Sequence, residues 1–96
     1  MLTGYNTNLA HRGVNFHVQT EDSGRNKPHI ITHLFHGGTI LASEKSGYAE
    51  LLESDDLKAE VNSRMEAQHK TMLRRLSQGE LDTVLCERLG TEVFPG

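Results

Sequence analysis

Two segments near the start of the chain alternate between apolar and polar residues, as strands with one buried face do. They run from Tyr5 to Leu9 and from Val14 to Val18. A two-residue turn at Arg12-Gly13 would align the apolar positions of both segments on one face of an antiparallel hairpin. The opposite face is polar and is expected to contact water; it comprises Asn6, Asn8, Asn15, His17 and Gln19.

A second hairpin is predicted for residues 30–43, because the pair Gly37-Gly38 can adopt the positive φ angles of a tight turn. The expected register pairs Phe35 with Ile40, Leu34 with Leu41, and His33 with Ala42. One face then holds Ile30, Thr32, Leu34 and Leu41, and the other holds Ile31, His33, Phe35, Ile40 and Ala42. Unlike the first hairpin, this one is apolar on both faces.

The second half of the chain has the 3.6-residue spacing of helices. A short helical turn is predicted for residues 48–53, a long helix for residues 54–76, and a last helix for residues 80–89 after the interruption at Gly79. The long helix carries an apolar stripe that comprises Leu57, Val61, Met65, Met72 and Leu76.

These elements predict the α+β class: a four-stranded antiparallel sheet of two β-hairpins, followed by one long and one short α-helix. The 96 residues correspond to a single domain over residues 1–96. Strands are expected over about 4–44, helices over about 48–89 and a C-terminal tail over 90–96. A chain of this size buries only about two-thirds of its unfolded surface, so a modest core is expected.

The apolar surface exceeds what one sheet and its helices can hide, and self-association is the simplest way to cover it. A helix about 35 Å long is expected to extend beyond a sheet only about 15–20 Å wide. A homodimer or another protein partner would cover this excess, through Ile31, His33, Phe35, Ile40, Met65, Met72 and Leu76. In the alternative, Tyr48, the short helical turn and the Val93-Phe94 tail cover the second hairpin within the monomer.

Six histidines, five of them in the first half, raise the possibility of a metal site. His17, His29 and His33 are the candidates. On one strand, however, His29 and His33 would lie about 13 Å apart, too far to share an ion. We therefore expect no cofactor and no metal, and interpret these side chains as polar-face or interface histidines, the residue type that makes an interface responsive to pH.

Catalytic patterns are weak. A cysteine nucleophile would have to be Cys86, whose position beside Leu85 and Leu89 is typical of a small buried hydrophobe. A histidine paired with Glu21 or Asp22 would allow acid–base chemistry. We expect no enzyme, and the small hydrolase or nuclease stays an alternative, as does a small metal- or ligand-binding protein that uses the N-terminal histidines.

Charge and composition exclude other classes. Residues 1–48 carry four basic and three acidic side chains, residues 49–96 carry six and ten, and together they give −3. This balance has no basic stripe of the kind that binds nucleic acid. Neither a membrane span nor a secretion signal is evident. A single cysteine cannot form an internal disulfide, which favours a cytoplasmic location.

Three segments carry a resemblance: Gly-Tyr-Asn-Thr-Asn, Phe-His-Val-Gln-Thr-Glu-Asp and Pro-His-Ile-Ile-Thr-His-Leu-Phe-His-Gly-Gly-Thr-Ile-Leu. Over residues 3–76 the chain resembles a small uncharacterised bacterial protein family, to which no function is attached. The resemblance implies a bacterial origin. The sequence as a whole predicts a non-enzymatic protein–protein interaction module, a homodimeric adaptor or regulatory subunit in a bacterial cytosol.

Overall fold

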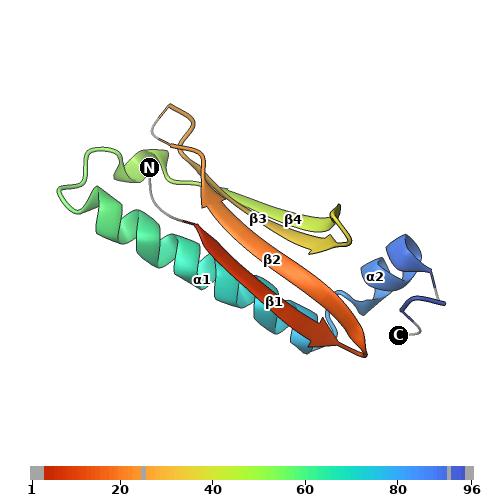
Figure 1. Cartoon of the computed structure of the whole chain (residues 1–96). Coiled ribbons are helices and arrows are strands. Elements are labelled where there is room, and N and C mark those ends of the chain that lie inside the picture. The colour runs from red at the N-terminus through yellow and green to blue at the C-terminus, as the bar shows by residue number, and fades with distance from the viewer. Residues whose placement is uncertain (1–3, 25, 91, 95–96) are drawn as a thin grey trace.

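The computed structural model describes residues 4–24, 26–90 and 92–94 (Figure 1). It confirms the α+β architecture. The strands are β1 (Tyr5–His11), β2 (Val14–Asp22), β3 (His29–His36) and β4 (Thr39–Gly47), followed by the 3-10 turn η1 (Ala49–Leu51) and the helices α1 (Leu57–Ser77) and α2 (Asp82–Leu89). Of the predicted tail, residues 91, 95 and 96 lie outside the described residues.

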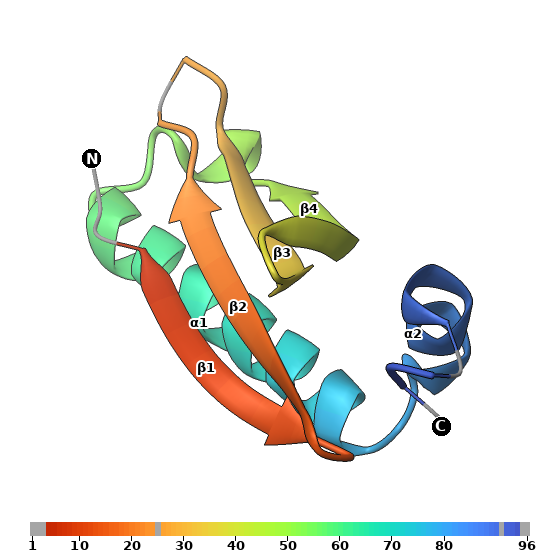
Figure 2. The same ribbon diagram turned by 45° about the vertical axis from the view of Figure 1, so that its right-hand side comes forward.

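The four strands form one antiparallel sheet in the order β1-β2-β3-β4, and α1 packs on one face of it (Figures 1 and 2). The helix runs along the strands rather than across them, and the molecule measures 49 × 20 × 19 Å. The comparison with the width of the sheet therefore does not apply: α1 follows the length of the strands, and its first turns extend past the start of β1, where they pack against η1 (Figure 1). Leu76, at the end of the helix, is buried with Leu81, Leu85 and Phe94, because α2 and the chain after it cover this end.

Both predicted turns are present. Arg12 and Gly13 have φ angles of 52° and 79°, Gly37 and Gly38 have 57° and 84°, and each pair closes a two-residue hairpin. The first hairpin has the register that a two-residue turn at Arg12-Gly13 implies: His11 pairs with Val14, Leu9 with Phe16 and Thr7 with Val18.

The register of the second hairpin differs from the prediction because β4 contains a bulge. Phe35 pairs with Ile40 as predicted, but Leu34 then pairs with Ala42 and His33 with Ser43. One extra residue shifts all later positions by one. Leu41 therefore stays in the core at 3% exposure, and Ala42 packs against the core instead of joining Phe35 on the opposite face.

The core consists of two apolar clusters under the sheet. The larger includes Phe16, Val18, Leu34, Met72 and Leu76 together with α2 and Phe94. The smaller comprises Ile30, Tyr48, Val61 and Met65. Tyr48 and Phe94 thus cover the face of the sheet that faces α1, which contradicts the alternative in which they cover the other face.

A group of hydrogen-bonded side chains, the polar layer, lies between these clusters; it comprises Thr7, Thr20, Thr32, Gln68 and His69. His69 is only 5% exposed, and Thr20 and Thr32 are fully buried. His69 occupies the stripe of α1 between Met65 and Met72 and bonds two different strands. No buried side-chain nitrogen or oxygen of the described residues lacks a partner, as a polar group in a core requires.

The donors and acceptors of the polar layer assign one protonation state to His69. Gln68 Nε2 donates to Thr32 Oγ1 at 2.9 Å. Because Thr20 and Thr32 are fully buried, each hydroxyl hydrogen needs an acceptor, so Thr32 donates to Thr20 Oγ1 at 2.7 Å and Thr20 donates to Nδ1 of His69 at 2.8 Å. Because Nδ1 is an acceptor, neutral His69 carries its proton on Nε2, which donates to Thr7 Oγ1 at 2.8 Å.

Protonation of His69 is unfavourable in the folded state. Burial lowers the pKa of His69 below its ordinary value of 6.5, and charge on His17 lowers it further. A proton on Nδ1 would also face Thr20 Oγ1, whose own hydrogen would lose its acceptor.

We predict that His69 makes the fold less stable in acid. The unfolded chain protonates His69 at a higher pH than the folded chain, so stability is full above about pH 6.5 and falls as the pH drops from there through the lower pKa of the folded state. Urea unfolding at several pH values should show this loss, and His69→Gln should reduce its slope. His29→Gln, at the start of β3, is the control and should keep it; equal slopes for wild type and His69→Gln would contradict the assignment.

Candidate interaction surface

The face of the sheet opposite α1, called the outer face below, is not covered by any described part of the chain (Figure 2). Strand register arranges its side chains in rows across the sheet. One row is Asn8, His17, Phe35 and Ile40, and the next is Asn6, Gln19, His33 and Ser43. The β1–β2 half of the outer face is therefore mostly polar, and the β3–β4 half carries the large apolar side chains Ile31, Phe35 and Ile40 among polar ones.

The five predicted polar residues all lie on this face. Asn6, Asn8 and Asn15 are exposed, and His17 and Gln19 are half-buried. The His17 ring is held by the two amides beside it, with Nδ1 at 2.7 Å from Asn8 Oδ1 and Nε2 at 3.2 Å from Asn6 Oδ1. The side chains of Asn6, Asn8 and His17 are thus oriented by hydrogen bonds with one another.

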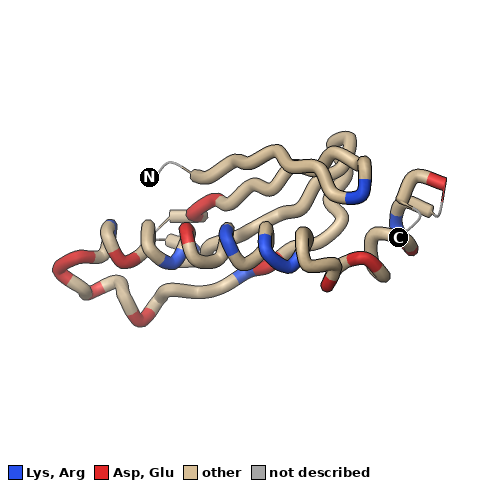
Figure 3. Tube along the Cα trace, turned by 90° about the horizontal axis from the view of Figure 1, so that it is seen from below, with Lys and Arg blue, Asp and Glu red and all other residues tan. Residues whose placement is uncertain are grey.

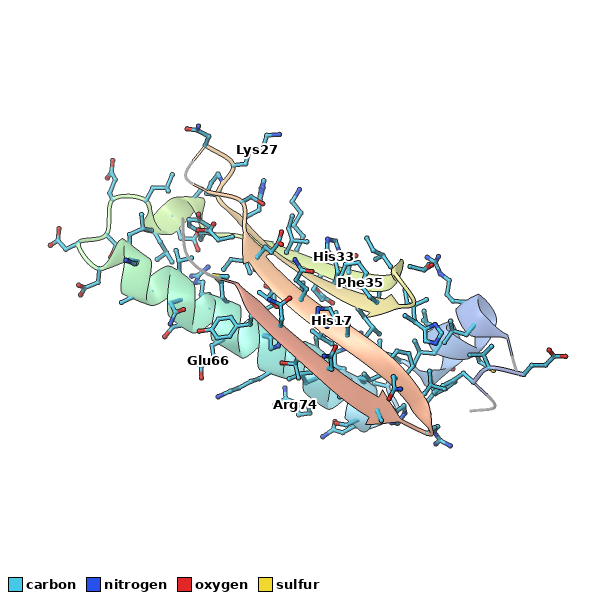
Figure 4. The ribbon with its side chains drawn as sticks, viewed as in Figure 1. His17, Lys27, His33, Phe35, Glu66 and Arg74 are labelled. Atoms are coloured by element: carbon cyan, nitrogen blue, oxygen red, sulfur yellow. The ribbon has the colours of Figure 1, made fainter. Side chains whose placement is uncertain are left out.

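Aromatic rings line up at the middle of the outer face (Figure 4). The Phe35 ring centroid lies 6.1 Å from that of His17 and 5.6 Å from that of His33, the latter in an edge-to-face arrangement. His33 Nδ1 is 2.8 Å from Ser43 Oγ. Ile31 precedes His33 on the same face of β3. Ile40, the cross-strand neighbour of Phe35, is 43% exposed.

A groove of about 700 Å³ opens where the two hairpins separate. The β1–β2 register continues to His11↔Val14, whereas the β2–β3 register ends at His17↔Phe35, so the tips of the hairpins diverge (Figure 2). The lining consists of Asn8, Leu9, Ala10, Asn15, Phe16, His17, Gln19, Phe35, Gly37 and Gly38. Phe16 belongs to the core at 2% exposure, so the groove reaches down to apolar atoms between polar rims.

Charge is distributed unequally over the molecule (Figure 3). On the outer face the described charged side chains are Glu21 and Lys45, which flank Ile31 in one row near the end of the sheet. The solvent side of α1, in contrast, carries charges along its length: Lys58, Glu60, Arg64, Lys70 and Arg74. A partner can therefore displace water from the centre of the outer face without the desolvation of a charged side chain.

The predicted interface residues divide into two groups. Ile31, His33, Phe35 and Ile40 lie together on the outer face. Met65, Met72 and Leu76 do not: their exposed fractions are 0%, 1% and 0%, and they pack between α1 and the sheet. A partner cannot reach these three, so their assignment to an interface is corrected to the core.

The metal candidates do not converge. His17 and His33 flank Phe35, whereas His29 pairs with Gly47 at the far end of β3. Within the described part of the chain, no group of three or more His, Cys, Asp or Glu side chains is placed to hold a metal ion.

One histidine–carboxylate pair was not predicted. His11 Nε2 lies 2.9 Å from Asp82 Oδ1, and Arg12 Nε lies 3.1 Å from Asp82 Oδ2. This pair fastens the β1–β2 turn to the start of α2. Cys86, one turn further along α2, is partly buried against the core cluster. Neither feature opens into the groove, whose lining contains none of these residues.

His69 and the groove were also missed. His69 lies four residues after Met65 on the apolar stripe, and Thr7, Thr20 and Thr32 occupy inward strand positions. The spacing of these four residues in the sequence could have predicted a buried polar layer. No feature of the sequence indicates the groove, because the groove depends on where the β2–β3 register ends.

No known protein family, curated protein or solved structure matches the chain. None of the described helices is long and apolar enough to cross a membrane.

Phe16 on β2 and Phe35 on β3 provide a test of which face of the sheet forms the core. We predict that Phe16→Ala lowers the free energy of unfolding by about 3–5 kcal/mol, because it leaves a cavity in the larger cluster. Phe35→Ala should cost about 1 kcal/mol or less, because its ring lies on the uncovered face. Urea unfolding of both variants measures the difference, and equal losses would contradict the placement of Phe35 outside the core.

Proposed function

We propose that this protein is a non-enzymatic interaction module, an adaptor or regulatory subunit of a bacterial cytosol, that binds a protein partner on its outer face and acts as a homodimer. The observation that carries the proposal is the set of apolar side chains on the β3–β4 half of that face. Phe35 lines a groove of about 700 Å³, Ile40 is its cross-strand neighbour and Ile31 lies on the same face of β3, and no other element of the described chain packs over them.

The chemistry of the face favours a protein as the occupant. Aromatic anchors surrounded by uncharged polar groups are typical of the energetic centre of protein interfaces. An apolar side chain of the partner would enter the groove between Phe16 and Phe35. The amides of Asn8, Asn15 and Gln19 along the rim would bond polar groups around that side chain.

A nucleic acid fits this face less well. Single-stranded nucleic acids stack on aromatic side chains, but they also need basic residues along the backbone path. Among the described residues of the outer face the one Lys, Lys45, is matched by Glu21 in the same row.

The proposal predicts a site-specific contact at position 35. A photo-crosslinking amino acid in place of Phe35, in the full chain expressed in bacterial cells, should form one defined protein adduct. Ile40→Glu in the same chain should reduce the adduct at least about tenfold, because it places an unpaired charge in the interface. The matched control is the same crosslinker at Thr71, an exposed position of α1, which should give no such adduct.

Two results would overturn the proposal: no adduct at position 35, or an adduct that persists unchanged with Ile40→Glu. Circular dichroism and urea unfolding confirm that each variant is folded. Since Ile40 is already 43% exposed, a charged side chain at this position should leave the stability of the monomer nearly unchanged.

A further inference from the structure

We infer that two copies of the chain associate through the free edge of β1, antiparallel about Asn8, to form one continuous eight-stranded sheet. A strand at the edge of a sheet exposes unpaired backbone N–H and C=O groups that can pair with another chain. In this sheet the edge strands are β1 and β4. The two strands differ in whether their residues protect these unpaired backbone groups from another chain.

The edge of β4 is protected. It contains the bulge opposite Leu34 and Phe35, and two consecutive charged residues, Glu44 and Lys45. The helix also reaches this edge: Arg75 pairs with Glu44 at 2.8 Å, and Gln68 Nε2 donates to the Glu44 carbonyl at 3.2 Å. Bulges, charges and covering side chains are the usual means of keeping an edge strand from pairing.

The edge of β1 has no bulge and no charged residue, and although Tyr5 and Thr7 bond α1 through their side chains, no side chain of the described residues bonds the outward backbone groups of this strand. Its seven residues, Tyr5–His11, include no Lys, Arg, Asp, Glu or Pro, and they pair with β2 in unbroken register. Thr7 and Leu9 point toward α1 but stay half-buried, whereas their cross-strand partners Val18 and Phe16 are 0% and 2% exposed. The helix side of this edge is therefore left incompletely covered.

The backbone of β1 is self-complementary. The hairpin turn makes His11↔Val14 a hydrogen-bonded pair, and hydrogen-bonded pairs alternate along an antiparallel ladder. The N–H and C=O groups of Asn6, Asn8 and Ala10 therefore point away from β2. In an antiparallel pair centred on Asn8, Asn8 meets its own copy and Asn6 meets Ala10, which gives up to about six backbone hydrogen bonds.

Charge and apolar contacts fit a second copy as the occupant. The symmetric pairing brings no charged strand residues together, and it places Thr7 beside Leu9 of the other copy. On α1, Leu73 is half-buried, and it lies on the β1 side because it shares the helix face of Asn62, which Tyr5 Oη contacts at 2.8 Å. A second copy along the edge would cover Leu9 and Leu73.

The pairing also enlarges the outer face. Four strands about 4.8 Å apart and about 26 Å long present roughly 500 Å², less than the roughly 800 Å² that each side of a standard interface buries. Two faces side by side present about 1,000 Å². This consequence depends on the proposed function of the outer face, whereas the edge pairing itself does not.

Charge reversal at the two-fold axis tests the pairing in the full chain. Wild type should sediment with twice its mass of 10.7 kDa at micromolar concentration. Asn8→Lys and Asn8→Asp should each weaken the dimer at least about 30-fold, because like charges meet at the axis. An equal mixture of the two variants should recover the dimer to within about tenfold of wild type. Ser43→Lys, on β4, is the control and should stay dimeric.

A second measurement needs no variant. In concentrated wild-type protein, the amide hydrogens of Asn6, Asn8 and Ala10 should exchange slowly, and dilution should remove their protection. Those of Thr7 and Leu9, which face β2, should stay protected at every concentration.

Three results would overturn the inference: a monomeric wild type, a dimer that persists in both Asn8 variants, or unprotected Asn6, Asn8 and Ala10 amides in the dimer. A dimer that Phe35→Glu dissociates while Asn8→Lys does not would place the second copy on the outer face instead. An intact edge dimer without any crosslink at position 35 would refute the proposed function alone.

Discussion

The contact between His69 and the sheet is the constraint on which the arrangement of helix and strands depends. One imidazole bonds Thr7 on β1 and Thr20 on β2, and Thr20 connects it to Thr32 on β3, which also accepts a hydrogen bond from Gln68. A shift of one residue in any of these strands would turn its threonine to the outer face. The polar groups left without partners would cost about 1–3 kcal/mol each, so the polar layer selects one register from the several that apolar packing alone would tolerate.

Because α1 packs on one face of the sheet, the other face has no helix over it. A single helical layer cannot cover both sides, and Tyr48 and Phe94 are both used on the helix side. The distribution of charge agrees with two different roles. The solvent side of α1 is charged along its length, as a surface in contact with water is, whereas the centre of the outer face carries no charged side chain among the described residues.

The separation of the two hairpin tips affects both sides of the sheet. On the outer side it forms the groove between Asn15 and Gly37. On the helix side it leaves space that α2 and Phe94 fill, with the Phe94 ring 6.2 Å from that of Phe16. The hydrogen bond of Asp82 with His11 and its ion pair with Arg12 hold α2 at this position. The groove and the docking of α2 are therefore two results of the same divergence of strands.

The sequence by itself determined the elements, because their signals are local: period-two alternation for the strands, paired turn residues for the hairpins and 3.6-residue spacing for the helices. It also placed Ile31, Phe35 and Ile40 on a face opposite to the core. Only the tertiary structure decided the bulge at Leu41, the burial of Met65, Met72 and Leu76, the groove and the role of His69. Each of these depends on which segments meet across the sheet, and strand pairing, helix direction and buried hydrogen bonds are not local properties of a sequence.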